Sequence, residues 1–149
     1  MAILTGSAIA AVGNDTTRST TALNPLGFTA YDSLGNEYTY IKAGATIAVN
    51  DAVRFQGSAL GFDDVRPTSA INQIVLGAAT AAFAANEYGF VLSKGVATVK
   101  VVNATAALSP LVTNATAGTL ALADATAFGL RPAVALVTGV TAGSGVALL

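Results

Sequence analysis

Short runs with β-strand character follow one another along most of this chain, and turn residues separate them about every ten positions. In the run 37–42, alternation places Tyr38, Tyr40 and Lys42 on one face of an extended strand. We expect further strands at 52–56, 88–92, 96–102, 111–113, 119–123, 132–140 and 146–149. The pattern predicts an all-β fold, a small antiparallel β-barrel or sandwich of roughly eight to ten short strands.

A weak repeat in the C-terminal half favours the same fold class. The tetrapeptide Asn-Ala-Thr-Ala occurs at 103–106 and at 114–117, and Asp-Ala-Thr-Ala follows at 124–127. Short strands joined by turns in an all-β domain have this spacing. Two or three copies are too few for a solenoid, in which repeats stack on one another.

The clearest local signal is a β-hairpin at 88–102. Two β-rich runs flank the short loop Ser93-Lys94-Gly95, and a glycine in such a loop is typical of a hairpin turn. The second run has an apolar and a polar face, with Ala97, Val99 and Val101 opposite Thr98 and Lys100.

The stretch 69–85 has two interpretations. Apolar residues at 71, 74, 75 and 78 fit one face of a helix, and Ala is the best helix former. The run 74–76 followed by Gly77 also suits a buried strand, so we expect a strand at 74–82 and keep the helix as the alternative. The preceding segment 57–67 is expected to be a loop.

Residues 1–30 differ from the rest, and we divide the chain into an N-terminal arm, 1–30, and a β-rich domain, 31–149. No period of 2 or 3.6 runs through the first segment, and 16–21 is rich in Thr. A frayed terminus is one interpretation. We favour an extended arm that lies on a neighbouring subunit, because the segment is more apolar than a free tail needs. The candidate interface anchors are Ile3, Leu4, Ile9 and Val12.

Missing residue types exclude several kinds of site. The chain has no Cys and no His, so it cannot form a disulfide, a Cys nucleophile or a Ser-His-Asp triad, and it lacks the usual zinc ligands. Seven Lys and Arg against eight Asp and Glu give a net charge of −1, which provides no basic field for nucleic acid. We therefore expect no enzyme activity, no cofactor and no nucleic-acid partner.

Three local patterns have a structural and a functional interpretation. Asp63-Asp64 is a solvated acidic loop or part of a metal site, and we favour the loop because too few other oxygen ligands are near in sequence. Gly143-Ser144-Gly145 lacks the Gly-Lys-Ser/Thr that completes a phosphate-binding loop. The four tyrosines at 31, 38, 40 and 88 are core or interface residues rather than a stacking platform.

The chain has no convincing membrane segment. The longest uncharged run, Val101–Ala123, is long enough to span a bilayer but contains Pro110 and Gly118. The N-terminus has no Lys or Arg before Arg18, so we expect no signal peptide.

Charged residues make up only 10% of the chain. So few charges leave either a neutral surface of Thr and Ser or a surface that partners cover, and we favour the second interpretation.

A family resemblance covers about three-quarters of the chain, from Tyr38 to the C-terminus. The stretches that carry it are EYTYIKAGATIAVNDAVRF at 37–55, RPTSAINQIVLGAATAAFAANEYGFVLSKGVATVKV at 66–101 and ATAGTLALADATAFGLRPAVAL at 115–136. They resemble the capsid decoration (cement) proteins of tailed bacteriophages, in particular podovirus-like marine and cyanobacterial phages. The resemblance does not extend clearly into residues 1–30.

This resemblance implies a structural virion protein on the outer surface of the head shell. It implies the major capsid protein as the partner and self-association, most simply as a trimer, with no membrane contact. The alternative is a phage head or tail fibre or a receptor-binding module.

Overall fold

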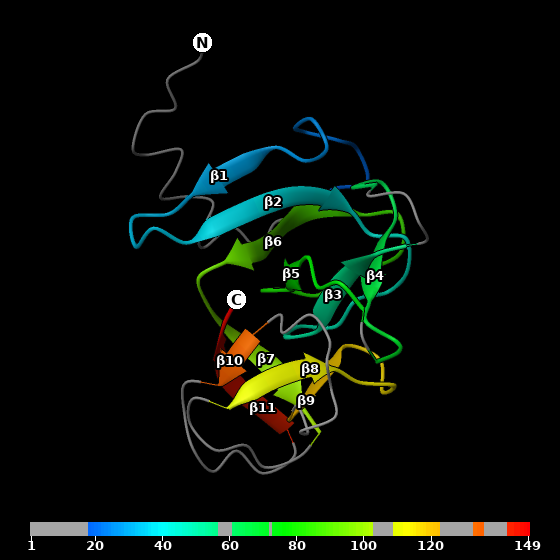
Figure 1. The fold of residues 1–149 in the computed structure, drawn as a ribbon. Coiled ribbons are helices and arrows are strands. Elements are labelled where there is room, and N and C mark those ends of the chain that lie inside the picture. The colour runs from blue at the N-terminus through cyan, green and yellow to red at the C-terminus, as the bar shows by residue number, and fades with distance from the viewer. Residues whose placement is uncertain (1–17, 57–60, 72, 103–108, 123–132, 136–142) are drawn as a thin grey trace.

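The computed structural model describes residues 18–56, 61–71, 73–102, 109–122, 133–135 and 143–149 (Figure 1). These residues form strands, turns and loops without any helix, so the all-β prediction is confirmed. No helix long and apolar enough to span a membrane occurs among them. The strands are β1 (Thr29–Tyr31), β2 (Glu37–Lys42), β3 (Ala52–Phe55), β4 (Val65–Pro67), β5 (Gly77–Ala78), β6 (Tyr88–Lys94), β7 (Val96–Val101), β8 (Pro110–Thr113), β9 (Thr119–Leu122), β10 (Ala133–Ala135) and β11 (Gly143–Leu148).

The first six strands form one sheet in the order β1-β2-β6-β5-β3-β4, and its neighbouring strands are antiparallel. The central strands are buried on both faces. Tyr40 and Phe90 belong to one apolar cluster, whereas Ile41 and Val91 belong to a second cluster. Successive strand residues point to opposite faces, so the sheet separates two apolar cores.

The last five strands form a closed barrel in the order β10-β11-β7-β9-β8, below the sheet in Figure 1. Strands β7 and β9 run parallel, and the other pairs in the barrel are antiparallel. The faces predicted for β7 are confirmed: Ala97, Val99 and Val101 are buried and Thr98 is exposed. Val99 packs in the same cluster as Tyr40, so one core extends from the sheet into the barrel.

The hairpin predicted at 88–102 is wrong. Strand β6 pairs with β2 and β5, whereas β7 pairs with β11 and β9. Gly95 turns the chain from the sheet to the barrel with a φ of 129°, and the Leu149 N–H donates to its carbonyl at 2.9 Å. A Cβ at Gly95 would collide with the Asn36 side chain. The physical reason for the difference is that β6 is buried on both faces, so it becomes a central strand of the sheet.

Two other predicted segments change length. The strand expected at 74–82 is reduced to the two residues of β5, and the helix alternative is absent from the described residues there. The loop expected at 57–67 contains β4 at its end, where Val65 is fully buried. β4 is an edge strand of the sheet, which is the position that Pro67 permits.

The chain from residue 18 to residue 30 packs on the sheet. Ser19 and Tyr88 exchange backbone hydrogen bonds, and the Arg18 guanidinium carbon lies 3.9 Å from the centre of the Phe83 ring. The boundary predicted between residues 30 and 31 falls inside β1, where Ala30 is buried. The proposed anchors lie within 1–17, outside the described residues.

Two turns of the same design hold the sheet together. The turn 43–51 joins β2 to β3, and the turn 79–87 joins β5 to β6. Each turn contains an Asn in the left-handed region followed by an acidic residue: Asn50 has a φ of 66° and Asn86 a φ of 69°. Asn is one of the few residue types that adopts this conformation readily.

The two turns bind each other in an approximately two-fold arrangement. Ile47 and Phe83 exchange backbone hydrogen bonds at the centre of the contact. On either side, Ala43 pairs with the backbone of 86–87 and Ala79 pairs with that of 50–51. The acidic side chains are equivalent too, since each accepts a hydrogen bond from the backbone N–H three residues before it, at 2.8 Å in the first turn and 2.7 Å in the second.

An ion pair between a buried carboxylate and a half-buried lysine connects the sheet to the barrel. Asp51 is 5% exposed, and its Oδ1 lies 2.6 Å from Nζ of Lys100 on β7. The Lys100 N–H also donates to the carbonyl of Asn50 at 3.0 Å. Gly118 completes the junction by accepting from Ala52 N–H at 2.8 Å. A charged contact and backbone bonds therefore fix the barrel against the sheet.

Candidate interaction surfaces

The structure gives Asp64 and two of the four tyrosines structural roles. Asp64 is bound to Arg66, and the described residues hold no group of three His, Cys, Asp or Glu side chains that fits a metal ion. Tyr38 and Tyr40 are buried in the core, as expected, and Tyr31 is 48% exposed at the edge of the sheet. The tyrosines do not share one exposed platform.

The turn between β1 and β2 is organised around one carboxylate. Asp32 accepts hydrogen bonds from the backbone N–H groups of Leu34 and Asn36, from the Asn36 side chain and from the Tyr38 hydroxyl. Burial by itself raises the pKa of Asp32, but these hydrogen bonds together lower it below the usual 3.8. Burial raises the pKa of Tyr38, and the charge of Asp32 and the hydrogen bond to it act in the same direction.

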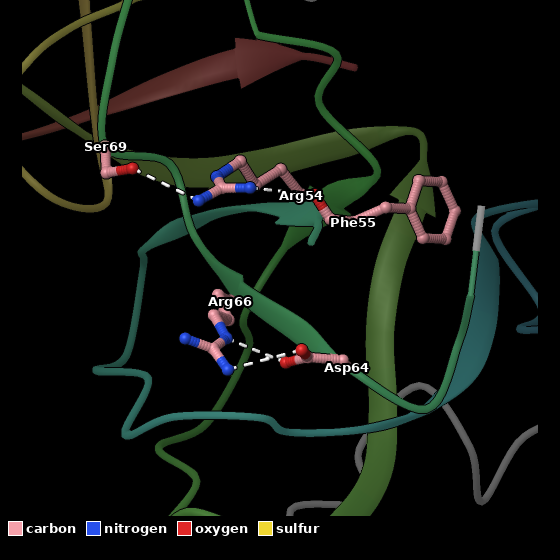
Figure 2. Close-up of polar contacts among 5 residues, drawn as sticks. All are labelled: Arg54, Phe55, Asp64, Arg66 and Ser69. Atoms are coloured by element: carbon pink, nitrogen blue, oxygen red, sulfur yellow. Dashed lines mark hydrogen bonds and ion pairs between the residues drawn. The ribbon is translucent and has the colours of Figure 1, made fainter. Parts of the chain in front are cut away.

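Two arginines face each other across the β3–β4 pair. Arg54 and Arg66 are direct partners in the antiparallel register, so their side chains belong to the same face of the sheet. Figure 2 shows the Arg54 side chain beside Ser69 and the Arg66 side chain beside Asp64. Like charges in directly opposite positions destabilise a strand pair. The surroundings of each guanidinium group therefore decide whether the pair is tolerated.

Arg66 has its own counterion. Its Nε lies 2.7 Å from Asp64 Oδ1, and its Nη2 lies 3.2 Å from Asp64 Oδ2, so the contact uses both carboxylate oxygens. This hydrogen bonding raises the pKa of the Arg66 guanidinium. Gly44 packs beside the contact, where a Cβ would meet the carboxylate.

Arg54 has only neutral partners in the described part of the chain. Its Nη1 donates to the Phe55 carbonyl at 2.9 Å, and its Nη2 donates to the Ser69 hydroxyl at 3.2 Å (Figure 2). Its Nε is buried and has no hydrogen-bond partner there. The ion pairs in the described ranges are Arg66–Asp64 and Lys100–Asp51, so neither gives Arg54 a counterion.

The loop that carries Ser69 also exposes apolar side chains. Gln73 fixes the loop, because its side-chain oxygen accepts from the N–H of Ser69 at 2.7 Å and its own N–H donates to Thr113 of β8 at 2.9 Å. Ile71 is 66% exposed and Ile74 is 55% exposed. We call Arg54, Arg66, Ser69, Ile71 and Ile74 the Arg54 surface.

A second apolar surface lies where the sheet meets the barrel. Val96 of β7 and Leu148 of β11 are cross-strand partners, and both are about half exposed. Leu34, at the tip of the β1–β2 turn, is 86% exposed. Asn36 of that turn accepts from the Val96 N–H at 3.4 Å, which brings the tip close to β7. We call Leu34, Val96 and Leu148 the Leu34 surface.

Sequence reasoning did not find either surface. A signal for the Arg54 surface exists, since the dipeptide Val-Arg occurs at 53–54 and again at 65–66. Both valines are fully buried, and alternation then turns both arginines to the opposite face. The Leu34 surface has no such signal, because it combines two strands and a turn from distant parts of the chain.

The fold has a counterpart among solved structures. The chain is similar to the crystal structure of the head fiber gp8.5 N base in bacteriophage phi29, with a TM-score of 0.55 and 14% sequence identity. The match covers 75% of this chain and 92% of that chain. The two chains share a fold. No protein-family model and no curated protein matches the sequence. At this identity the likeness shows the fold, and nothing in it specifies a decoration protein or a marine phage.

Proposed function

We propose that this chain is a non-enzymatic structural protein of a bacteriophage virion, which binds the outer surface of the head shell and stabilises the capsid. The observation that carries the proposal is the fold shared with the phi29 head fiber base, which extends over 92% of that chain. The absence of Cys and His from the sequence and the two surfaces with exposed apolar side chains support a binding role.

Stabilisation of this kind follows from mass action. A protein that binds the assembled shell, and not free coat subunits, lowers the free energy of the shell by its binding free energy. Contacts with two or more copies of the major capsid protein raise the effective concentration of the second contact. We also propose self-association, with a trimer as the first expectation. Sedimentation of the purified protein tests the oligomeric state, and a monomer at high concentration would contradict self-association.

A fibre base is the second candidate, because the structural neighbour is itself the base of a head fiber. A decoration protein and a fibre base both attach to a head, but they differ in number. A decoration protein covers the shell in copies comparable to the coat subunits, whereas a fibre occupies far fewer positions.

Electron microscopy of the parent particle, combined with the copy number per virion, tests both candidates. Density for this fold on the outside of the head supports the proposal, and the copy number then separates decoration from fibre. Density inside the head or in the tail, or no copies in purified virions, would overturn it. Purified protein added to heads that lack it provides an independent test, since bound protein should raise the temperature at which the heads open.

A further inference from the structure

The Arg54 guanidinium is oriented and lacks a counterion among the described residues. The hydrogen bonds to the Phe55 carbonyl and the Ser69 hydroxyl fix the plane of the group. Those contacts use two of its five N–H donors. The guanidinium is partly removed from water next to a second arginine at the opposite register position, and only Arg66 has a carboxylate.

We propose that the Arg54 surface receives a carboxylate from an acidic segment of the protein to which this chain attaches. The inference rests on the proposed function and specifies one contact of that attachment. An arginine with a fixed plane and free donors suits a bidentate carboxylate, because the fork of N–H groups matches the two oxygens. A carboxylate here would also reduce the repulsion between Arg54 and Arg66, which occupy opposite positions in the β3–β4 register.

The neighbouring residues favour a protein partner over nucleic acid. Ile71 and Ile74 are exposed on the loop that holds Ser69, and arginine beside exposed apolar side chains is typical of protein interfaces. Asp63 and Asp64 lie beside the arginines in sequence and would repel a chain of phosphates. Three other basic side chains are already engaged: Lys100 binds Asp51, Arg18 lies over the Phe83 ring, and Lys42 lies over the Tyr88 ring. Lys94 is the one exposed basic residue in the described ranges, which is too few for a basic stripe that follows a phosphate backbone.

The first experiment uses the full chain without heads. The ¹H–¹⁵N signal of Arg54 Nε is followed by NMR while sodium acetate replaces sodium chloride at constant ionic strength. We expect saturable shifts of that signal in the wild type. The spectrum of Arg54→Gln, which lacks the Nε group, identifies which signal belongs to Arg54. Lys94→Gln is the matched control, since it removes one positive charge from an exposed site at the end of β6. A signal that responds to acetate no more than to chloride would overturn the inference.

The second experiment measures binding of the same variants to heads that lack the protein. We expect Arg54→Gln to weaken binding by at least about tenfold, because truncating one partner of a buried ion pair has a large effect on dissociation. Arg54→Lys should weaken it too, since lysine keeps the charge but loses the planar fork. Lys94→Gln should bind within about twofold of the wild type, as a single exposed charge contributes little. Thermal unfolding of each variant confirms that it is folded.

The outcomes separate the inference from the proposed function. If the wild type binds heads and Arg54→Gln binds equally well, the inference is wrong and the proposed function stands. If the wild type does not bind heads but the Arg54 signal responds to acetate, the proposed function is wrong and the carboxylate site stands. Arg54-dependent binding of a labelled single-stranded oligonucleotide in preference to acetate would overturn the assignment to an acidic protein segment.

Discussion

Lys100→Met is expected to destabilise the protein more than Asp51→Asn, although both changes remove the same ion pair. The reason is the unequal burial of the two partners, since 7% of the Asp51 side chain and 34% of the Lys100 side chain is exposed. Without Lys100, the Asp51 carboxylate stays buried, and among the described residues the Ala48 N–H is the hydrogen-bond donor that it keeps. Without the negative charge at position 51, the ammonium group can rotate into water.

The two losses differ by an amount that is easy to measure. Leaving one member of an ion pair charged and buried costs about 3–5 kcal/mol. Asp51→Asn loses one charge-assisted hydrogen bond, but the Lys100 ammonium group is hydrated again, so we expect this variant to lose about 1–2 kcal/mol of stability. Methionine fills most of the volume of the lysine side-chain stem, so lost packing adds little to the destabilisation expected for Lys100→Met. A difference of about 2 kcal/mol corresponds to about 4–8 °C in Tm for a domain of this size.

Urea and thermal unfolding at pH 7, followed by circular dichroism, test this expectation on the two single variants and on the combined Asp51→Asn/Lys100→Met variant. The combined variant has no unpaired buried charge, so it should be more stable than Lys100→Met alone. Equal losses in the two single variants, or a combined variant less stable than Lys100→Met, would refute the reasoning from burial.

Three further predictions concern the turns and the N-terminus. Asn86→Gly should change the free energy of unfolding by less than about 0.5 kcal/mol. Asn86→Val should lower it by about 1–2 kcal/mol, because a β-branched residue is strained at a φ of 69°. Urea unfolding of both variants measures the two changes, and equal losses of stability would contradict this prediction. The lowered pKa of Asp32 means that its contribution to stability is present above pH 3.8 and is lost as the pH falls through the folded-state value. The penalty of Asp32→Asn should therefore be measurable at pH 7 and shrink towards pH 2, and a penalty that does not change with pH would count against this account. Deleting residues 2–13 should leave a folded, self-associating protein that no longer binds heads, and failure to fold would place this segment in the core.

Local patterns predicted the strands whose two faces differ. β7 has one apolar and one polar face in sequence, and the structure buries the first and exposes Thr98 on the second. β8 and β9 were also expected within one residue of their observed ends. Alternation is sufficient for β7, because one of its sides faces a core and the other does not. β8 has no such contrast, since Leu111, Val112 and Thr113 are all buried.

Pairing over long sequence distances escaped the same reasoning. The loop at 93–95 has the composition of a hairpin turn, but the two strands beside it do not pair with each other. β6 pairs with β2 and β5 instead, because the continuous burial of Gly89–Leu92 requires a neighbouring strand on each side. The two interlocked turns do have a signal, since Ala-x3-Ile-x2-Asn-Asp at 43–51 and Ala-x3-Phe-x2-Asn-Glu at 79–87 share one spacing. Their contact depends on backbone hydrogen bonds between the two segments, which no single-segment pattern contains.

Gly95 also divides the described strands into two sets that leave the ribosome one after the other. All six sheet strands precede it and all five barrel strands follow it, so the sheet is synthesised as a complete set first. The face of the sheet that carries Tyr40 and Phe90 nevertheless needs residues of the barrel to complete its apolar cluster. The barrel closes only when β11, which ends at Leu148, pairs with β7. Between the synthesis of β6 and that of β11, that aromatic face lacks its partners in the barrel and stays open to water, so the nascent chain is exposed to aggregation during this interval.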